Sequence, residues 1–286
     1  MGIMGSLLGT HLSPHSAFAS SVAPGLQHVL GDPRHFACIH DLAHNHLWLS
    51  QPLEQINTPR QPGSLIKLLT AQVALETGVT SPTRQFSCPG WLELPPPLGR
   101  FPCWDPRGHG DLTLTQALAH SCNVHFYELG QRLGSRVLEH ALHNQQLIAP
   151  TEPVEGVTLA PWLATGQDPQ LHCTPLALLT WLMRVAQGQG MYGGRHGDLI
   201  RTGMVMAVES GTCKGLFHPG GLAAKTGTIL SHQRFQGWVG AFWPRAQPRW
   251  VMLVFVQDGR AAVLGIPTAQ RVVEWVERHP QTDPPR

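Results

Sequence analysis

The chain has 286 residues, of which 42% are hydrophobic and 13% charged, and its formal net charge is +2. This length and hydrophobic content fit one sizeable folded domain, and the low charged fraction argues against a disordered protein. No basic run accompanies the small net charge, so nucleic-acid binding has no electrostatic support. The sequence also lacks a stretch of about 20 apolar residues, which excludes a full membrane span within it.

The two ends are predicted to lie outside the folded domain. Residues 1–34 are expected to be a leader rich in Ser, Gly, Pro and His. Ala17-Phe18-Ala19 offers a small-x-small cleavage pattern after an apolar start, but the positive residues of a signal peptide are missing. A cleaved signal peptide and a disordered leader therefore both stay open. Residues 280–286 are expected to be a frayed tail, which leaves one catalytic domain over residues 35–279.

The pattern between these ends predicts an α+β domain. Apolar runs at 36–39 and 46–49 predict a β-hairpin, and residues 64–77 predict a core helix ended by Gly78. Residues 81–110 are predicted to be loop. Further helices are expected over 113–120, 124–133, 176–186 and 269–278, and three strands over 222–229, 237–243 and 250–256. This order indicates a fold in which the two terminal segments share one sheet.

The use of lysine is unusually sparse. Only Lys67, Lys214 and Lys225 occur, against 17 arginines, and a buried lysine can lose its proton and act as a base whereas arginine cannot. Lys67 follows Ser64 by three residues at a predicted helix start, where free N–H groups favour developing negative charge. The two side chains then share a helix face. Taken alone, this Ser-x-x-Lys motif fits a capping serine and a surface lysine as well.

Two further short motifs contain polar groups in suitable places. Ser121-Cys122-Asn123 lies between two predicted helices, where a hydroxyl could relay a proton and an amide could hold a substrate, although Ser and Asn are also common in turns. Lys225-Thr226-Gly227 lies in a predicted strand. Gly227 would let a substrate backbone approach, and the lysine and threonine could hold a carboxylate. An ordinary edge-strand lysine is the alternative for this motif.

Together, in this order and local context, the three motifs resemble the transpeptidase domain of penicillin-binding proteins, which belongs to a superfamily shared with class A and class D β-lactamases. Gln61-Pro62-Gly63-Ser64 and Ala224–Thr228 extend the resemblance, which covers about residues 35–278. It implies a β-lactamase/transpeptidase-like fold, with an antiparallel sheet flanked by helices and a mainly helical subdomain. It also implies the roles of the motif residues: Ser64 as acylated nucleophile, Lys67 as general base and Ser121 as proton relay, with Asn123, Lys225, Thr226, Gly227 and Thr228 binding substrate.

The function implied by the resemblance is serine acyl transfer outside the cytoplasm, in the periplasm or beyond. The expected activity is that of a D,D-transpeptidase or D,D-carboxypeptidase, with peptidoglycan stem peptides ending in D-Ala-D-Ala as substrates, β-lactams as acylating ligands and no cofactor. A β-lactamase and a sensor that is acylated without turnover are the alternatives. Slow release of penicillin is expected. The chain lacks a well-placed glutamate of the class A type, and it carries Asn123 where class D enzymes have an apolar residue.

Six cysteines complete the sequence inventory: Cys38, Cys88, Cys103, Cys122, Cys173 and Cys213. None forms a C-x-x-C pair and no Cys/His spacing is typical of zinc, so no metal site is expected. Cys88 and Cys103 bracket a Pro-rich loop, which makes them a candidate disulfide in an oxidising compartment. Two reduced thiols fit the same positions.

Overall fold

A six-stranded sheet forms the centre of the protein, seen here in a computed structural model that describes residues 19–96, 98–148 and 159–279. The strand order is β1-β3-β2-β10-β9-β8, antiparallel except for the parallel β1–β3 pair. The strands are β1 (Ala19–Val22), β2 (Phe36–Asp41), β3 (His46–Leu49), β8 (Ala223–Ser231), β9 (Arg234–Trp243) and β10 (Trp250–Gln257). The predicted hairpin and the predicted three-strand meander thus share one sheet, as expected.

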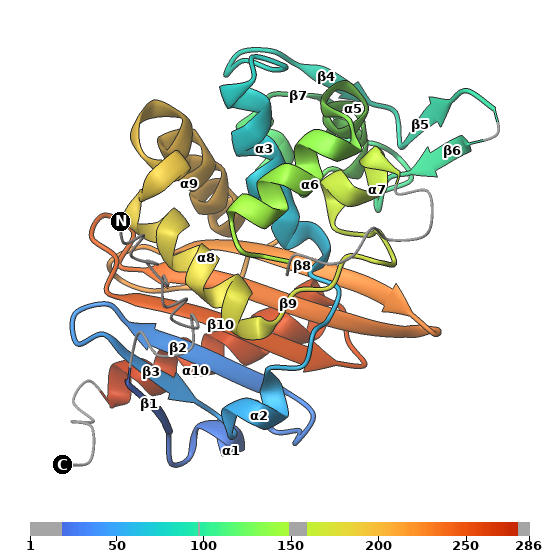
Figure 1. Cartoon of the computed structure of the whole chain (residues 1–286). Coiled ribbons are helices and arrows are strands. Elements are labelled where there is room, and N and C mark those ends of the chain that lie inside the picture. Colours follow the sequence, from blue (N-terminus) through green and yellow to red (C-terminus); the bar gives the residue numbers. More distant parts are fainter. Residues whose placement is uncertain (1–18, 97, 149–158, 280–286) are drawn as a thin grey trace, which may run out of the picture.

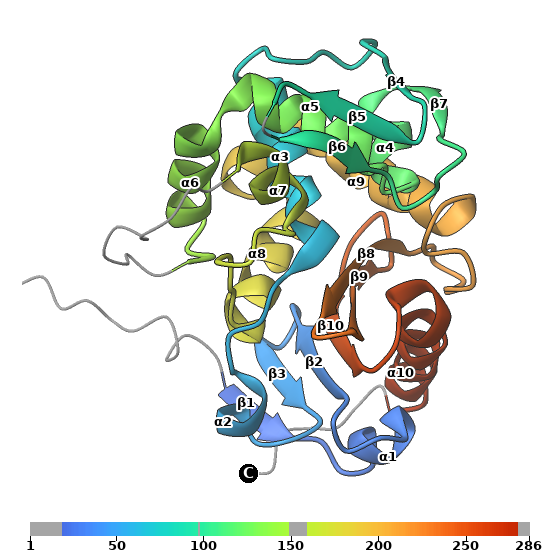
Figure 2. The ribbon, with the colours of Figure 1, turned by 90° about the vertical axis from the view of Figure 1, so that its right-hand side faces the viewer.

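Helices cover both faces of this sheet (Figures 1 and 2). The small helix α1 and the long helix α10 lie on one face, while α8 lies on the other, below a helical region that contains α3 to α7. The helices are α1 (Leu26–Leu30), α2 (Leu53–Ile56), α3 (Lys67–Glu76), α4 (Leu114–Ala119), α5 (Asn123–Leu133), α6 (Ser135–Asn144), α7 (Ala160–Thr165), α8 (Pro175–Gln187), α9 (Gly194–Glu209) and α10 (Ile266–Arg278). The predicted α+β class is confirmed.

Strand β10 shows why the sheet has a core on each face. Successive side chains of a strand point to opposite faces, and here Val251, Leu253 and Phe255 join the core beneath the helical region. Met252 and Val254 join the second core, against α1 and α10. A strand buried on both faces reads as a continuous apolar run, and that run made this strand recognisable in the sequence.

Residues 81–110 differ from the prediction of a loop. They contain two small antiparallel pairs, which β4 (Phe86–Cys88) forms with β7 (Gly110–Leu112) and β5 (Trp91–Leu94) forms with β6 (Gly99–Pro102). Each strand has only three or four residues, which is too short for a period-2 pattern to emerge. The prediction of a structureless loop is therefore wrong for these segments.

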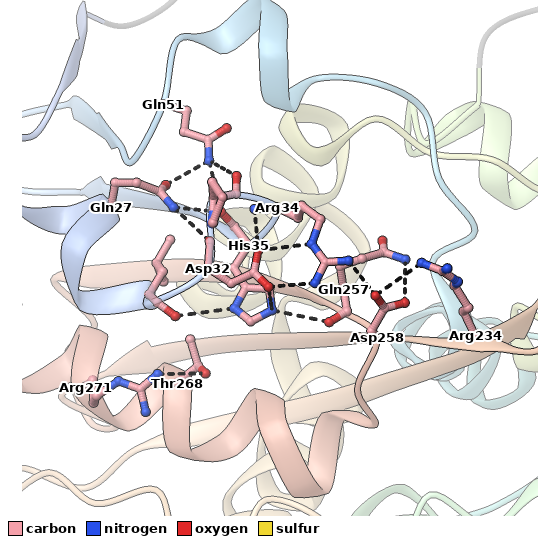
Figure 3. A network of polar contacts seen from close by, with 12 residues as sticks. Gln27, Asp32, Arg34, His35, Gln51, Arg234, Gln257, Asp258, Thr268 and Arg271 are labelled. Carbon is pink, nitrogen blue, oxygen red and sulfur yellow. Dashed lines mark hydrogen bonds and ion pairs between the residues drawn. The ribbon is translucent and has the colours of Figure 1, made fainter.

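Part of the expected leader belongs to the fold. Strand β1 extends the central sheet, and α1 packs against α10. Figure 3 shows polar contacts that hold this segment to the rest of the protein: Arg34 bridges Asp258 at 2.5 Å, and Gln51 donates a hydrogen bond to Gln27 at 2.8 Å. The boundary predicted at residue 34 is thus placed too late. Residues 1–18, with most of the cleavage pattern, and the tail 280–286 lie outside the described residues.

The structure offers no helix for crossing a membrane among these described residues, because none is both long and apolar enough.

Candidate active site

Ser64 lies in a tight turn that leads into α3. A 3-10 turn spans Gly63–Ile66, and the α-helix begins at Lys67, three residues later than predicted. A 3-10 turn has three residues per turn, so the side chains of Ser64 and Lys67 start on the same side. Ser64 is 8% exposed and Lys67 is fully buried, which places a hydroxyl near the surface above a lysine cut off from water.

Glycines allow the close packing of this turn. Gly63 has φ of 55°, and a Cβ on it would lie 3.2 Å from the backbone nitrogen of Thr228. A Cβ on Gly227 would lie 2.7 Å from the carbonyl oxygen of Pro62. Strand β8 therefore runs directly beside the chain that carries Ser64, and the space at Gly227 is taken by the protein's own Pro62 carbonyl.

The amine of Lys67 is held by the second motif. Its Nζ donates hydrogen bonds to the Ser121 carbonyl oxygen at 2.8 Å and to Asn123 Oδ1 at 2.6 Å, and it lies 3.4 Å from Ser121 Oγ. Burial lowers the pKa of Lys67 from 10.5 to about 8, because a charged amine is disfavoured away from water. A substantial fraction of this amine is therefore neutral in weakly alkaline solution.

Ser121 occupies a strained turn between α4 and α5. Its φ is 51°, in the left-handed region that non-glycine residues rarely adopt. Such strain costs about 1–3 kcal/mol and is found at functional sites. The Ser121 amide donates to the Leu118 carbonyl at 3.2 Å, and the Cys122 amide donates to Ala117 at 3.0 Å. These bonds hold the strained turn in place.

The third motif brings a second buried lysine to the same hydroxyl. Lys225 Nζ donates to Ser121 Oγ at 2.8 Å and to the Thr226 carbonyl oxygen at 2.9 Å, and the side chain is fully buried. Burial first, and the charge of Lys67 second, lower the pKa of Lys225 to about 7. Two ammonium groups this close repel one another, so the pair titrates as a unit and readily gives up one proton.

The hydroxyls of β8 have different surroundings. Thr226 is 6% exposed and its Oγ1 lies 2.8 Å from Thr212 Oγ1. Thr228 is half-buried, and its Oγ1 accepts a hydrogen bond from the Ala261 amide at 3.1 Å. The Thr228 side chain thus has a partner within the fold, while its backbone nitrogen faces the turn at Gly63.

All eight predicted site residues therefore come together from three separate parts of the chain. Sequence reasoning assigned no role to Thr212, whose amide also donates to the Ala119 carbonyl at 3.1 Å and so ties α4 to the β8 motif. It also missed Trp104, which is 55% exposed and donates through Nε1 to the His120 carbonyl at 3.0 Å. A lone threonine and a loop tryptophan give no periodic signal that would have identified them.

The cysteines correct one sequence-based expectation. All six are free and buried, so the candidate disulfide between Cys88 and Cys103 is not formed. Instead Cys88, Cys103 and Cys122 gather with His109, and their four ligand atoms lie within 4.8 Å of one another. The spacing of cysteines and histidines in the sequence did not reveal this cluster, because the four residues are spread over 35 positions and match no familiar pattern.

Comparison with known proteins places this geometry in a family. A family model described as the penicillin binding protein transpeptidase domain matches residues 50–274. Peptidoglycan D,D-transpeptidase MrdA of Acinetobacter baumannii is 34% identical over 73 residues, which are 26% of this chain and 11% of that protein. Stage V sporulation protein D of Bacillus subtilis is 39% identical over 79 residues, 27% of this chain and 12% of that protein. The match thus spans about a tenth of each curated relative.

Solved structures share the fold at low sequence identity. PBP2 of Pseudomonas aeruginosa, in complex with WCK 5153, superposes with a TM-score of 0.74 at 19% identity, over 88% of this chain and 73% of that chain. PBPA of Mycobacterium tuberculosis superposes with a TM-score of 0.73 at 19% identity, over 88% of this chain and 79% of that one. With the family model matching most of its length, the chain belongs to the penicillin-binding protein transpeptidase family.

Proposed function

We propose that the protein is a serine acyltransferase that acts on peptides ending in D-Ala-D-Ala and is acylated by β-lactams. The observation that carries the proposal is the convergence of two buried lysines on one hydroxyl: Lys67 Nζ lies 3.4 Å and Lys225 Nζ 2.8 Å from Ser121 Oγ. A structural serine has no need of two desolvated amines, whose burial costs free energy. Such groups are typical of sites that move protons.

Acylation follows from the roles that these positions support. Ser64 Oγ attacks the carbonyl carbon of the scissile amide while neutral Lys67 takes the hydroxyl proton. The tetrahedral intermediate then collapses, the C–N bond breaks, and Ser121 passes a proton from the lysine pair to the leaving amine. The backbone N–H groups of Ser64 and Thr228 would stabilise the oxyanion, a contribution of about 3–4 kcal/mol per donor in other acyl-transfer enzymes.

The terminal carboxylate of the substrate would complete the site through Lys225. A carboxylate beside Lys225 raises the pKa of that amine, because an opposite charge favours the protonated form. Both amines are hydrogen-bonded to the Ser121 turn. A positive charge on Lys225 therefore disfavours a second positive charge on Lys67. Substrate binding would thereby keep Lys67 neutral and ready to act as base.

The free edge of β8 suits a peptide substrate. Strand β8 ends the sheet and pairs only with β9 among the described strands. An exposed strand edge accepts an extended peptide through main-chain hydrogen bonds. Thr226 and Gly227 would then face the substrate backbone, and Asn123 would hold its amide.

Peptidoglycan stem peptides are the substrate class that we infer, because the MrdA relatives of Acinetobacter baumannii and Escherichia coli are peptidoglycan D,D-transpeptidases by name. The acyl-enzyme would pass to an amine acceptor in a transpeptidase or to water in a carboxypeptidase, and both reactions take place outside the cytoplasm. Slow hydrolysis of a β-lactam ester is expected. Hydrolysis of the ester needs a base that activates water. In the described part of the chain, Lys67 forms hydrogen bonds with Ser121 and Asn123, and neither of these residues carries a carboxylate that could serve as that base.

Time-resolved intact mass spectrometry with penicillin tests the assignment. The wild type should gain one penicillin mass and keep it, Ser64→Ala should gain none, and Ser87→Ala, at an exposed strand position, should behave as the wild type. An adduct that persists in Ser64→Ala would exclude this nucleophile. Sustained nitrocefin turnover of about tens per second, ordinary for an enzyme, would replace the proposal with a β-lactamase. Release of D-alanine from a stem peptide would identify carboxypeptidase activity.

A further inference from the structure

Tyr127 is a buried residue of α5 that the proposed mechanism does not use. It is 2% exposed and lies four residues after Asn123 in the same helix. Residues at this spacing are neighbours on one helix face. The Tyr127 hydroxyl is within hydrogen-bonding distance of Gln167 Oε1, at 3.1 Å, and of the Pro102 carbonyl oxygen, at 3.4 Å. This hydroxyl therefore lies between the second motif and the loop that follows α7.

The direction of the Tyr127 proton follows from these neighbours. A tyrosine hydroxyl donates one proton and accepts through its oxygen, whereas a backbone carbonyl can only accept. The proton is therefore directed to Gln167 Oε1 or the Pro102 carbonyl. Burial raises the pKa of Tyr127, so the hydroxyl keeps this proton, while a hydrogen bond with the Asn123 side chain opposes the rise. In that bond the Tyr127 oxygen accepts, and the Nδ2 group of Asn123 donates.

The other end of the Asn123 amide faces the proposed base. Asn123 Oδ1 lies 2.6 Å from Lys67 Nζ. A charged lysine amine can only donate, so it holds Oδ1 in this position by itself. A neutral amine also has a lone pair that can accept, and it would fit an amide turned by 180° equally well. That turn would direct Nδ2 at the lone pair with which Lys67 takes the Ser64 proton.

We propose that Tyr127 is a positioning residue that holds the Asn123 amide in one orientation, with Nδ2 turned away from Lys67. This inference rests on the proposed function, in which Lys67 is the base and Asn123 binds substrate. Tyr127 accepts from Nδ2 whatever the charge on Lys67, so the orientation persists when Lys67 becomes neutral. The lone pair of Lys67 then stays free for the Ser64 proton, and the second N–H of Nδ2 stays free for a carbonyl of the substrate.

The loop that contacts Tyr127 also contacts the nucleophile turn. The Gln167 amide donates to the Trp162 carbonyl at 2.9 Å, which ties the loop to α7. At the preceding Gly166, a Cβ would lie 2.0 Å from the Gly63 carbonyl oxygen, next to Ser64. The hydroxyl of Tyr127 and the turn of Ser64 are thus placed by the same short segment, which fixes the Asn123 amide relative to the nucleophile.

Tyr127→Phe tests the proposal, because phenylalanine keeps the ring and removes only the hydroxyl. Acylation of Ser64 by penicillin G, followed by time-resolved intact mass spectrometry, should slow by about 3- to 10-fold, the factor that one ordinary hydrogen bond supplies. The chain has one other tyrosine, Tyr192, which is fully buried and accepts from Trp181 Nε1 at 2.7 Å outside the site. Tyr192→Phe is the matched control and should keep the wild-type rate. A wild-type rate in Tyr127→Phe would refute the proposal.

A double-mutant cycle separates positioning from a general effect on the fold. In the Asn123→Ala background there is no amide left to orient, so adding Tyr127→Phe should leave the acylation rate of that variant unchanged. An equal loss in both backgrounds would show that Tyr127 does not act through Asn123, and the proposal would be wrong.

A pair of ligands gives a second readout that needs only the single variant, whether or not Asn123→Ala folds. Penicillin G and its parent nucleus, 6-aminopenicillanic acid, share the β-lactam ring and the carboxylate, but only penicillin G has a side-chain amide that Nδ2 can bind. Tyr127→Phe should therefore slow acylation by penicillin G more than acylation by the nucleus, because a turned amide loses the ligand contact as well as the free base. A loss of the same size with both ligands would overturn the proposal.

The role of Tyr127 and the proposed function are distinguished by the same measurements. If the wild type is not acylated at Ser64, the proposed function fails and the role of Tyr127 falls with it. If the wild type is acylated but Tyr127→Phe and Tyr192→Phe react at the same rate, the function stands and only the role of Tyr127 fails.

Discussion

Replacing Lys67 with methionine should remove much of the pH dependence of folding stability. The fully buried Lys67 amine has its pKa lowered from 10.5 to about 8. Between these values the unfolded chain holds more protons at this position than the folded chain, so stability rises with pH there. As the pH falls from 10 to 7, Lys67 should therefore cost the wild type roughly 2–3 kcal/mol of unfolding free energy.

Methionine has a similar length and cannot titrate, so Lys67→Met should lose less stability over the same pH change. At pH 10 the variant should be the less stable protein. Asn123 Oδ1 and the Ser121 carbonyl lose their donor, and a buried acceptor left without a partner costs about 1–3 kcal/mol. At pH 7 the difference should shrink or reverse, because the wild type then also holds a buried charge.

Denaturant unfolding at pH 7 and pH 10 measures both effects. Lys214→Met serves as the matched control, because it removes an exposed lysine outside the site and should follow the wild type at both pH values. Groups that titrate independently of Lys67 cancel in the comparison. Lys225 does not cancel, because the charge of Lys67 contributes to its lowered pKa, and losing that charge further reduces the pH dependence of the variant. If Lys67→Met loses as much stability on acidification as the wild type, Lys67 is not a desolvated amine, and its role as general base loses its physical basis.

Three further substitutions and one control probe the site through acylation by penicillin. Lys67→Arg should slow acylation by about 10²-fold or more, the usual contribution of a general base, whereas Lys225→Arg should retain part of the rate because a carboxylate partner needs only charge; equal losses would contradict the base assignment. Gly166→Ala should slow acylation. Its Cβ would lie 2.0 Å from the Gly63 carbonyl oxygen, so the turn that carries the neighbouring Ser64 would have to shift. The control Gly78→Ala, with a similar φ of 72° but open space around it, should cost about 1–2 kcal/mol and leave the acylation rate unchanged.

The elements that the sequence predicted best are those with strong local signals. Helix α8 begins after Thr174, whose side chain accepts from the Ala177 amide at 3.2 Å, and it ends at Gly188 in a left-handed conformation. The helix predicted over 176–186 therefore differs from α8 by only one residue at each end, because a capping threonine followed by proline and a terminal glycine mark both ends in the sequence. Helix α9, in contrast, contains several glycines and was not predicted. Glycine disfavours a helix, and here packing, mainly against α4 and β8, compensates.

The candidate site also has a part that the sequence predicts and a part that only the fold shows. Three short motifs predicted eight residues that the fold brings together, because each motif places polar groups at a fixed spacing within a short segment. What the sequence could not show is how these elements meet: that both lysines reach Ser121, or that β8 runs against the turn at Gly63. The thiol cluster was missed for the same reason, since its four residues become neighbours only when β4 and β7 pair across the loop.

The Ser121–Asn123 turn is where these features combine. A left-handed residue turns the chain sharply, so successive side chains can reach different neighbours. Ser121 and Asn123 contact the buried lysines, whereas Cys122 between them contacts the other thiols. A regular helix would place these side chains about 100° apart along one axis and could not direct them so. The strain at Ser121 must be offset by its surroundings, among them the hydrogen bonds that the Ser121 and Cys122 amides donate to the end of α4.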